Sequence, residues 1–311
     1  MDYIVVVGSL NMDFVVAVDR LPAPGQTVLG SNFQTIPGGK GANQACAAGK
    51  LGSGSVRTRM IGRVGQDVFG DQLKASLSAA GVDVSFVAAD PRQPTGVAMI
   101  WVDAAGQNSI VVASGANAML AASEMDSIRP VFRGAACALF QLETPVDTVR
   151  TALEFAQEEG VRTMLDPAPA QLLPAELLKR VDILTPNETE ACILLGRKPA
   201  RVWMGDAPGL CQSLRKLGAK AVVLKLGEQG CFYLGDERAI QSPSFAVEVR
   251  DTTAAGDTFN GALAVALAEH RPVEAALQFA NAAAALSVTR VGAQASIPTR
   301  AEVDAFLGSS G

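Results

Sequence analysis

Short β-branched runs that alternate with helical segments are the feature that most constrains the fold of this 311-residue chain. Each run ends at a glycine or at polar residues, and helically spaced segments fill the gaps between the runs. The expected strands are 3–7, 138–142, 163–165, 182–184 and 221–226, and the expected helices between them are 67–80, 146–159, 189–195 and 209–217. This cadence predicts a Rossmann-like α/β fold, a doubly wound and mostly parallel sheet with helices on both faces.

Two pairs of extended segments break the cadence. The first pair, 14–18 and 28–33, flanks a proline-bearing turn, and the second pair, 96–102 and 108–113, flanks a turn with Gly106. Both are typical of hairpins, and neither fits a βα unit. We therefore expect one α/β domain over 1–311 with a small inserted β-sheet, a lid formed by insertions at approximately 13–36 and 95–114. The last third should be helical, at 256–269, 273–289 and 300–307.

Composition excludes several classes of protein. A net charge of −5 gives no general electrostatic reason to bind nucleic acid or an anionic membrane. The five cysteines are an odd number without a C-x-x-C pair, and the apolar run at 4–7 is too short for a signal segment or a membrane span. Both features predict a cytoplasmic protein. The single histidine, His270, excludes a His-rich metal site and a Ser-His-Asp triad.

A glycine-rich segment, Pro37-Gly38-Gly39-Lys40-Gly41-Ala42-Asn43-Gln44, leads into an alanine-rich helix. Glycines let a backbone pass close to a ligand, and the start of a helix offers unpaired N–H donors. The segment is neither a Walker A loop nor G-x-G-x-x-G. Taken alone, it is equally consistent with a structural turn and a ligand loop.

A run of small residues, 251–256, opens the helix that carries Asp257. Free N–H groups at such a start can hold an oxyanion, and the carboxylate of Asp257 would then reach a substrate hydroxyl beside it. The alternative is that Asp257 or Asp251 caps the helix, which is the commoner use of Asp at this position.

Two further pairs follow expected strands. Asn187 and Glu190 share one side of a first helical turn, as a hydrated Mg²⁺ near phosphates would require, although a helix cap explains them equally well. Asn11 and Asp13 share a face of an extended segment and would suit the hydroxyls of a sugar, although N-x-D is also common in turns.

Together these segments resemble the ribokinase family of sugar kinases, the PfkB type, nearly from end to end. The motifs that carry the resemblance are GSLNMD (8–13), PGGKGANQ (37–44), GRVGQDVFG (62–70), QLE (141–143), DPAPA (166–170), TPNETE (185–190), LGEQG (226–230), DTTAAGDTFNGA (251–262) and VTRVGAQAS (288–296). The resemblance implies a Rossmann-like domain with a β lid, ribose and ATP as substrates, and transfer of phosphate to the 5-hydroxyl of ribose.

The resemblance also implies roles for individual residues. The catalytic base would be Asp257, and the sugar would be held by Asn11, Asp13, Gly39, Lys40, Gly41, Asn43 and Glu143. The nucleotide site, with a backbone anion hole at Ala255 and Gly256, would comprise Asn187, Lys225, Leu226, Gly227, Glu228, Gln229, Gly230, Ala255, Gly256 and Asn281. Mg²⁺ would be organised by Asn187 and Glu190. A monovalent cation, preferably K⁺, would be bound, mostly through backbone oxygens, by Asp251, Thr253, Ser287, Arg290, Gly292 and Ser296. Two lids would join in a homodimer.

Three other functions make different demands on these residues. A related kinase could act on deoxyribose, another pentose or a nucleoside, but an Asn11 amide aimed at a 2-hydroxyl would be left unpaired by a deoxy sugar. Two Trp and two Tyr give no sign of a nucleoside-base pocket. A sugar-binding regulator would not need the base and the anion hole, and a nicotinamide dehydrogenase would need G-x-G-x-x-G after the first strand. Lys225 departs from the family, since a small hydroxyl residue is frequent there, and Asn281 stands where His also occurs.

Overall fold

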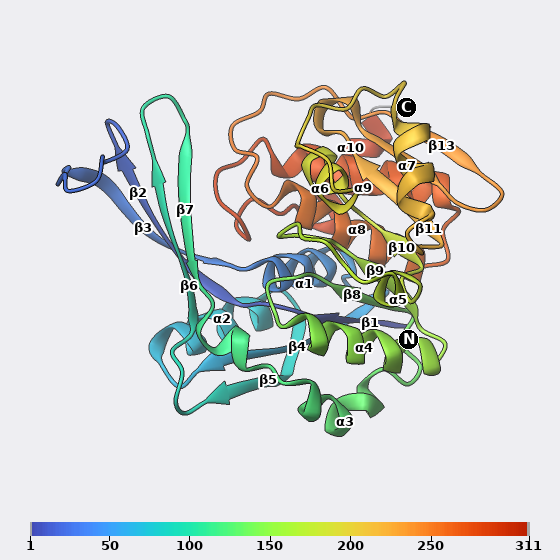
Figure 1. Ribbon diagram of the computed structural model, residues 1–311, viewed down its shortest axis with the longest axis horizontal. Coiled ribbons are helices and arrows are strands. Elements are labelled where there is room, and N and C mark those ends of the chain that lie inside the picture. Colours follow the sequence, from blue (N-terminus) through green and yellow to red (C-terminus); the bar gives the residue numbers. More distant parts are fainter. Residues whose placement is uncertain (1, 310–311) are drawn as a thin grey trace.

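The main sheet of the computed structural model, which describes residues 2–309, has nine strands in the order β13-β12-β11-β10-β9-β8-β1-β4-β5 (Figure 1). Neighbours from β5 to β11 are parallel, and β12 and β13 are antiparallel. The strands are β1 (Tyr3–Val7), β4 (Arg57–Gly65), β5 (Val82–Asp90), β8 (Cys137–Phe140), β9 (Arg162–Leu165), β10 (Ile183–Leu184), β11 (Ala221–Lys225), β12 (Cys231–Leu234) and β13 (Ala239–Ser242). The predicted mostly parallel α/β sheet is confirmed. The sequence pattern does not predict β4, β5, β12 and β13; in β4, three arginines interrupt the apolar run.

Two hydrophobic cores lie on the two faces of this sheet. Because side chains alternate along a strand, Ile4 and Val6 of β1 enter one core, and Val5 and Val7 enter the other. The first core is covered by α1 (Lys40–Leu51), α2 (Val68–Ala79), α8 (Ala255–Ala268), α9 (Val273–Ser287) and α10 (Arg300–Ser309). The second is covered by α3 (Met125–Ile128), α4 (Val146–Glu158), α5 (Ala175–Leu178), α6 (Glu188–Leu194) and α7 (Ala207–Arg215). Short 3₁₀ turns are η1 (Gly115–Met119), η2 (Ala122–Glu124), η3 (Arg129–Val131) and η4 (Gly227–Gln229).

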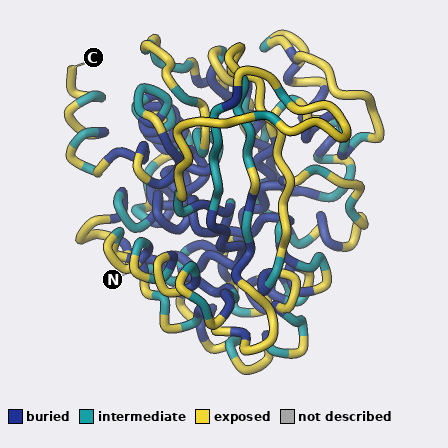
Figure 2. The backbone as a smooth tube through the Cα atoms, turned by 90° about the vertical axis from the view of Figure 1, so that its left-hand side faces the viewer, coloured by how far each residue is buried: buried dark blue, intermediate teal, exposed yellow. Residues whose placement is uncertain are grey.

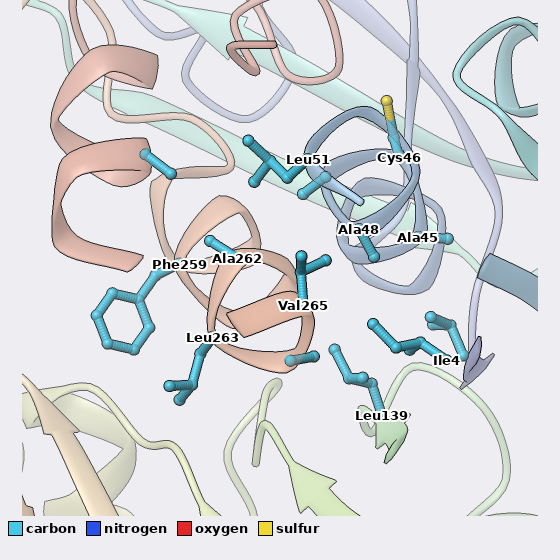
Figure 3. Close-up of a cluster of buried hydrophobic side chains, with 14 of the residues drawn as sticks. Ile4, Ala45, Cys46, Ala48, Leu51, Leu139, Phe259, Ala262, Leu263 and Val265 are labelled. Atoms are coloured by element: carbon cyan, nitrogen blue, oxygen red, sulfur yellow. The ribbon is translucent and has the colours of Figure 1, made fainter. Parts of the chain in front are cut away.

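Helices α1 and α8 pack closely against each other over the first core. Figure 3 shows Ala45 and Ala48 of α1 beside Ala262 and Val265 of α8. A β-carbon added to Gly261 would lie 2.6 Å from the β-carbon of Ala47, so the two backbones approach more closely than larger residues would allow. This contact brings the amino ends of both helices to one place.

A second, four-stranded sheet stands apart from the main sheet (Figure 1). Its order is β3-β2-β6-β7, from β2 (Asn11–Val18), β3 (Gly30–Gly38), β6 (Gly96–Val102) and β7 (Asn108–Ala113). Two antiparallel hairpins, β2–β3 and β6–β7, are joined through parallel pairing of β2 with β6. Both expected hairpins are therefore present, and Figure 2 shows their strands as largely intermediate or exposed in front of a buried body.

All five cysteines are free and buried, as expected for reduced small apolar side chains. Among residues 2–309, no helix combines the length and the apolar character needed to cross a bilayer.

Candidate active site

Polar side chains collect where the parallel strands of the main sheet end, from β1 to β11. In an open α/β sheet, the crevice beyond the carboxyl ends of the strands, at the point where the strand order reverses, is the usual ligand site. Ser9 follows β1, Glu143 follows β8, Asp166 follows β9, Asn187 follows β10, and Lys225 ends β11. The amino ends of α1 and α8 meet this edge and bring Asn43 and Asp257 to it.

Asp257 lies in the first turn of α8 and is only 6% exposed. Its two carboxylate oxygens accept hydrogen bonds of 3.0 Å from Asn43 Nδ2 and from Gln44 Nε2. Burial raises the pKa of Asp257 to about 6; Lys40 and the two amide donors oppose this rise, and Asp166 adds to it. A buried carboxylate that titrates close to neutrality is well suited to accept a proton.

The start of α8 lacks a side-chain cap. Its N-cap residue is Ala254, which has a left-handed φ of 58°, and no side chain of the described chain accepts a bond from the first turn. The alternative in which Asp251 or Asp257 caps α8 is therefore wrong. Ala255 N–H donates to Thr252 O at 3.2 Å, whereas the N–H groups of Gly256 and Asp257 find no acceptor among residues 2–309. The open donor pair is thus shifted by one residue from the expected Ala255 and Gly256.

Asn11 and Asp13 lie on β2, where that strand leaves the main sheet. Asn117 from η1 donates through Nδ2 to Asn11 Oδ1 at 2.8 Å, which identifies the other end of the Asn11 amide as the donor nitrogen. Asp13 accepts no hydrogen bond from the described chain. Burial raises its pKa to about 7, and Glu143 and Asp257 add to the rise.

Lys40 and Glu143 complete this part of the edge. Glu143 Oε2 accepts from Ser9 Oγ at 2.5 Å and from Lys40 N at 3.0 Å, which fixes the first turn of α1 against β8. Burial disfavours the charged form of Lys40, but Asp257, Asp166, Glu143 and Glu190 outweigh it and hold the Lys40 pKa above its usual value. The ammonium therefore stays charged.

Glycines allow α1 to start where it does. Gly39 has a φ of +88°, and a β-carbon on it would lie 2.7 Å from Asn11 N. A β-carbon on Gly41 would lie 2.5 Å from Ser9 N, while Gly41 N donates to Ser9 Oγ at 3.3 Å. Asn43 Oδ1 is buried without a hydrogen-bond partner in the described chain, so it is an unsatisfied acceptor beside Asp257.

A cavity of about 900 Å³ extends from α8 toward β11 and α9. It is lined by nine of the ten residues expected to contact the nucleotide: Lys225, Leu226, Gly227, Glu228, Gln229, Gly230, Ala255, Gly256 and Asn281. Asn187, the tenth, is not part of the lining. Apolar residues, among them Phe245, Val247 and Ala284, form much of the remaining wall.

Asn281 serves the structure as well as the cavity. Its Nδ2 lies 3.0 Å from Ser242 Oγ, 3.2 Å from Ser242 O and 3.1 Å from Pro243 O, and so ties α9 to the end of β13. This leaves only Oδ1 for a ligand in the cavity.

Asn187 and Glu190 form a capping box at the start of α6. Asn187 Oδ1 accepts from Glu190 N at 2.8 Å, while the two oxygens of Glu190 accept from Asn187 N at 2.7 Å and from Asn187 Nδ2 at 2.9 Å. The helix cap, which was the structural alternative for this pair, is therefore present. Burial raises the pKa of Glu190, Lys225 opposes it, and Asp166 adds to it, so this carboxylate interacts electrostatically with the rest of the site.

The residues expected to hold a monovalent cation come from two loops that Asp251 joins. Its Oδ1 accepts from Thr253 N and Thr253 Oγ1, and its Oδ2 accepts from Gly292 N at 2.8 Å. Burial opposes ionisation, but these bonds hold the pKa of Asp251 below its usual value. The side chains of the other members are occupied elsewhere: Ser287 and Ser296 each bond a local carbonyl, and Arg290 pairs with Glu302 at 2.7 Å. The two serine hydroxyls donate in these bonds and keep their oxygen lone pairs, so hydroxyl and carbonyl oxygens remain available to a cation, whereas the Arg290 guanidinium has no lone pair to offer.

Sequence reasoning missed the residues that hold the site in place. Gln44 Nε2 lies 2.9 Å from Asp166 Oδ2 and also bonds Asp257, and Gln141 Nε2 donates to Gln44 Oε1 at 2.6 Å. Lys225 Nζ donates to Asp166 Oδ1 at 3.1 Å. Gln44, Gln141 and Asp166 all stand in motifs quoted above, but their contacts join residues far apart in the chain.

Comparison with known proteins identifies the family. The model of the pfkB family of carbohydrate kinases matches residues 1–300. Ribokinase of Bacillus subtilis is 42% identical over 311 residues, covering 98% of this chain and 99% of that protein, and deoxyribokinase of Salmonella typhi is 34% identical over 305 residues, covering 98% of each. The structure of Arabidopsis thaliana ribokinase complexed with ribose and ATP superposes with a TM-score of 0.91 at 36% identity over 98% of both chains. The chain, with its carboxylate beside an uncapped helix start, belongs to the pfkB family of carbohydrate kinases.

Proposed function

We propose that this chain is a ribokinase, which transfers the γ-phosphoryl group of ATP to the 5-hydroxyl of D-ribose and releases ribose 5-phosphate and ADP. The observation that carries the proposal is the position of Asp257, a buried carboxylate with a pKa of about 6 beside two N–H groups that have no acceptor within residues 2–309. The ribokinase relatives support ribose as the sugar.

The proposed chemistry needs a base, an anion hole and correct positioning. Asp257 accepts the proton of the attacking hydroxyl as the bond to phosphorus forms. The N–H groups of Gly256 and Asp257 and the positive end of α8 stabilise negative charge on the transferred group. Lys40, whose ammonium stays charged, lies among the acidic groups of the sugar side. Phosphoryl transfer requires little other covalent work from the protein, so positioning and charge stabilisation supply most of the catalysis.

Sugar hydroxyls would be bound by acceptors and donors that the protein itself leaves unpaired. The carboxylate of Asp13 and the buried Oδ1 of Asn43 are acceptors without a partner in the described chain, and the amide nitrogen of Asn11 is a donor whose direction Asn117 sets. Glu143 supports them through Ser9 and the backbone of Lys40. Gly39 and Gly41 let the backbone approach the sugar.

Mg²⁺ would be organised by Asn187 and Glu190. Each Glu190 oxygen accepts one bond within the chain and retains a lone pair, so the carboxylate suits a hydrated Mg²⁺. Within residues 2–309 no three acidic, cysteine or histidine side chains are arranged to hold a metal ion, and nucleotide-bound Mg²⁺ takes most of its ligands from phosphate and water. When bound, the ion would neutralise phosphate charge.

A monovalent cation, preferably K⁺, would be held by Asp251 and by backbone oxygens of Thr253, Ser287, Arg290, Gly292 and Ser296. The anchoring of both loops by one carboxylate beside the start of α8 supports this assignment. Replacement of K⁺ by a bulky organic cation should slow turnover. An unchanged rate would disprove the proposed cation site.

The experiment that tests the function compares kcat/KM for ribose, 2-deoxyribose and adenosine, with ADP release as the readout in Mg-ATP and K⁺. We expect a clear preference for ribose because a deoxy sugar leaves one polar group of the site unpaired. A preference for either other substrate would assign the protein to the alternative, a related kinase of deoxyribose, another pentose or a nucleoside. Calorimetric binding of ribose without ADP release would instead indicate a non-catalytic sugar-binding regulator.

We also propose that the second sheet is the lid of the site and that two copies pair through it. Supporting this, every residue of β7 is exposed, including the apolar Ile110, Val111 and Val112, and β3 and β7 are both edge strands. Uncovered apolar edges favour association with a second copy. Light scattering should give a molecular mass of twice 32.2 kDa, and Val111→Lys should shift this mass toward that of the monomer. A monomeric mass for the unmodified protein would disprove the pairing.

A further inference from the structure

Lys225 lies between the two halves of the proposed site. It is the last residue of β11, its N–H donates to Pro186 O at 2.9 Å, and it forms a β-bridge with Asn187. Its ammonium bonds Asp166, which is 4% exposed, while the Lys225 side chain keeps 13% exposure on the nucleotide cavity. The side chain is therefore held by a buried carboxylate, and part of it is open to a ligand.

The ammonium is aimed at the start of α8. A β-carbon built on Gly256 would lie 3.4 Å from Lys225 Nζ; apart from its chain neighbours and the backbone of α8, the Lys225 side chain alone among residues 2–309 would lie within 4 Å of it. Gly256 and Asp257 supply the free N–H groups of that turn. The lysine and the open donors thus face the same small volume.

The Lys225 ammonium and the positive amino end of α8 together favour the binding of an anion between them. The amino end of a helix carries a partial positive charge, so an ammonium beside it is unfavourable until negative charge binds there. Asp166 holds the ammonium through Oδ1, and Glu190 also interacts with it electrostatically, while the β-carbon position of Gly256 lies 3.4 Å from the ammonium nitrogen. The site also holds several carboxylates that interact electrostatically with one another or with Lys40, namely Asp13, Glu143, Asp166, Glu190 and Asp257.

We propose that Lys225 is a catalytic residue that contacts the γ-phosphoryl group of ATP during its transfer, and that Asp166 is the residue that positions it. This inference rests on the proposed kinase function and assigns one contact within it. In the reaction, the bond from phosphorus to the ADP oxygen breaks as the bond to the sugar oxygen forms, and the hydroxyl proton goes to Asp257. The proposed contribution of Lys225 is charge and hydrogen bonds only.

A simpler role must be separated from this one: Lys225 could serve only to neutralise Asp166. The two roles differ in a charge-balanced double variant. Lys225→Met/Asp166→Asn removes both charges, so it restores neutrality but not a phosphate contact. Lys220→Met is the matched control, because Lys220 precedes the same strand at its opposite end and pairs with Asp182 on the surface.

The test measures kcat for ribose and the affinities for Mg-ADP and for Mg²⁺ with adenylyl imidodiphosphate, which retains a γ-phosphoryl group. We expect the double variant to lose at least about tenfold in kcat and in affinity for the analogue, with little change for ADP. Asp166→Asn alone, which keeps the ammonium, should retain most of the preference for the analogue over ADP while lowering kcat.

Recovery of unmodified kcat and analogue affinity in the double variant would overturn the proposal. If that variant does not fold, Lys225→Thr/Asp166→Asn tests the same point with a smaller hydroxyl side chain. The analogue-to-ADP ratio does not depend on the sugar, so a protein that keeps this ratio but fails to phosphorylate ribose would refute the proposed substrate and not the Lys225 contact.

Discussion

The side-chain nitrogen of Gln44 lies 3.0 Å from Oδ1 of Asp257, and Gln141 fixes the orientation of that amide from behind at 2.6 Å. Gln44 follows Asn43 in α1, and Asn43 bonds the other carboxylate oxygen. Two consecutive residues of one helix therefore set the direction of a carboxylate on another helix. The close packing of α1 on α8 makes this arrangement rigid.

Replacement of Gln44 should slow the reaction and move its pH dependence. Gln44→Leu removes a donor that lowers the pKa of Asp257, so the acid limb of kcat should move to higher pH, and kcat at pH 7 should fall about tenfold. A pH–rate profile checks this, with Gln107→Leu, in the exposed turn before β7, as the control. An unmoved acid limb would show that Gln44 does not act through Asp257.

Replacement of Asp257 should lower kcat far more than replacement of Gln44 does. Asp257→Asn keeps the shape of the side chain but cannot take a proton, so kcat should fall by about 10² to 10⁴, or about 3 to 5 kcal/mol of barrier. In the unmodified enzyme, kcat should rise with pH through about 6, where Asp257 loses its proton. Steady-state assays measure both effects, and near-normal turnover of the variant would disprove the assignment.

The unliganded protein should be more stable without the charge of Asp13. Its pKa is raised to about 7 in the folded state, so the folded protein binds more protons than the unfolded chain, and this residue costs stability as pH rises from about 4 to 7. Asp13→Asn should gain about 2 kcal/mol relative to the unmodified protein across that range, after allowance for partial exposure. Urea unfolding at pH 4.5 and pH 8 tests this; an equal difference at both values would contradict it.

Gly39 should tolerate no side chain. Gly39→Ala combines a positive φ with a β-carbon 2.7 Å from the backbone nitrogen of Asn11, so it should destabilise the protein by more than about 2 kcal/mol and impair sugar binding. Gly54→Ala is the matched control, since Gly54 has a φ of +82° and open space around it, and should cost only about 1 kcal/mol. Equal unfolding energies for the two variants would mean that the close approach has no consequence.

Local sequence was sufficient for much of the fold. The run at 3–7 matches β1, and helices such as α4 and α9 begin where expected, because apolar periodicity and strand-ending glycines act over a few residues. The same holds for the two hairpins. Strands such as β4, whose buried positions lie between arginines, carry no comparable local signal and form because β1 and β5 flank them.

The sequence by itself determined which segments form the site, since its motifs place glycines, carboxylates and amides at strand ends and helix starts. Only the tertiary structure decided what those groups do to one another. Gln44 and Asp257 are 213 positions apart, and Gln44 and Asp166 are 122 apart, so their hydrogen bonds depend on the order of strands in the sheet. The absence of a cap on α8 within the described chain, and the pairing of Lys225 with Asp166, follow from the same geometry, because the sheet order and the α1–α8 contact set these distances and the burial that shifts each pKa.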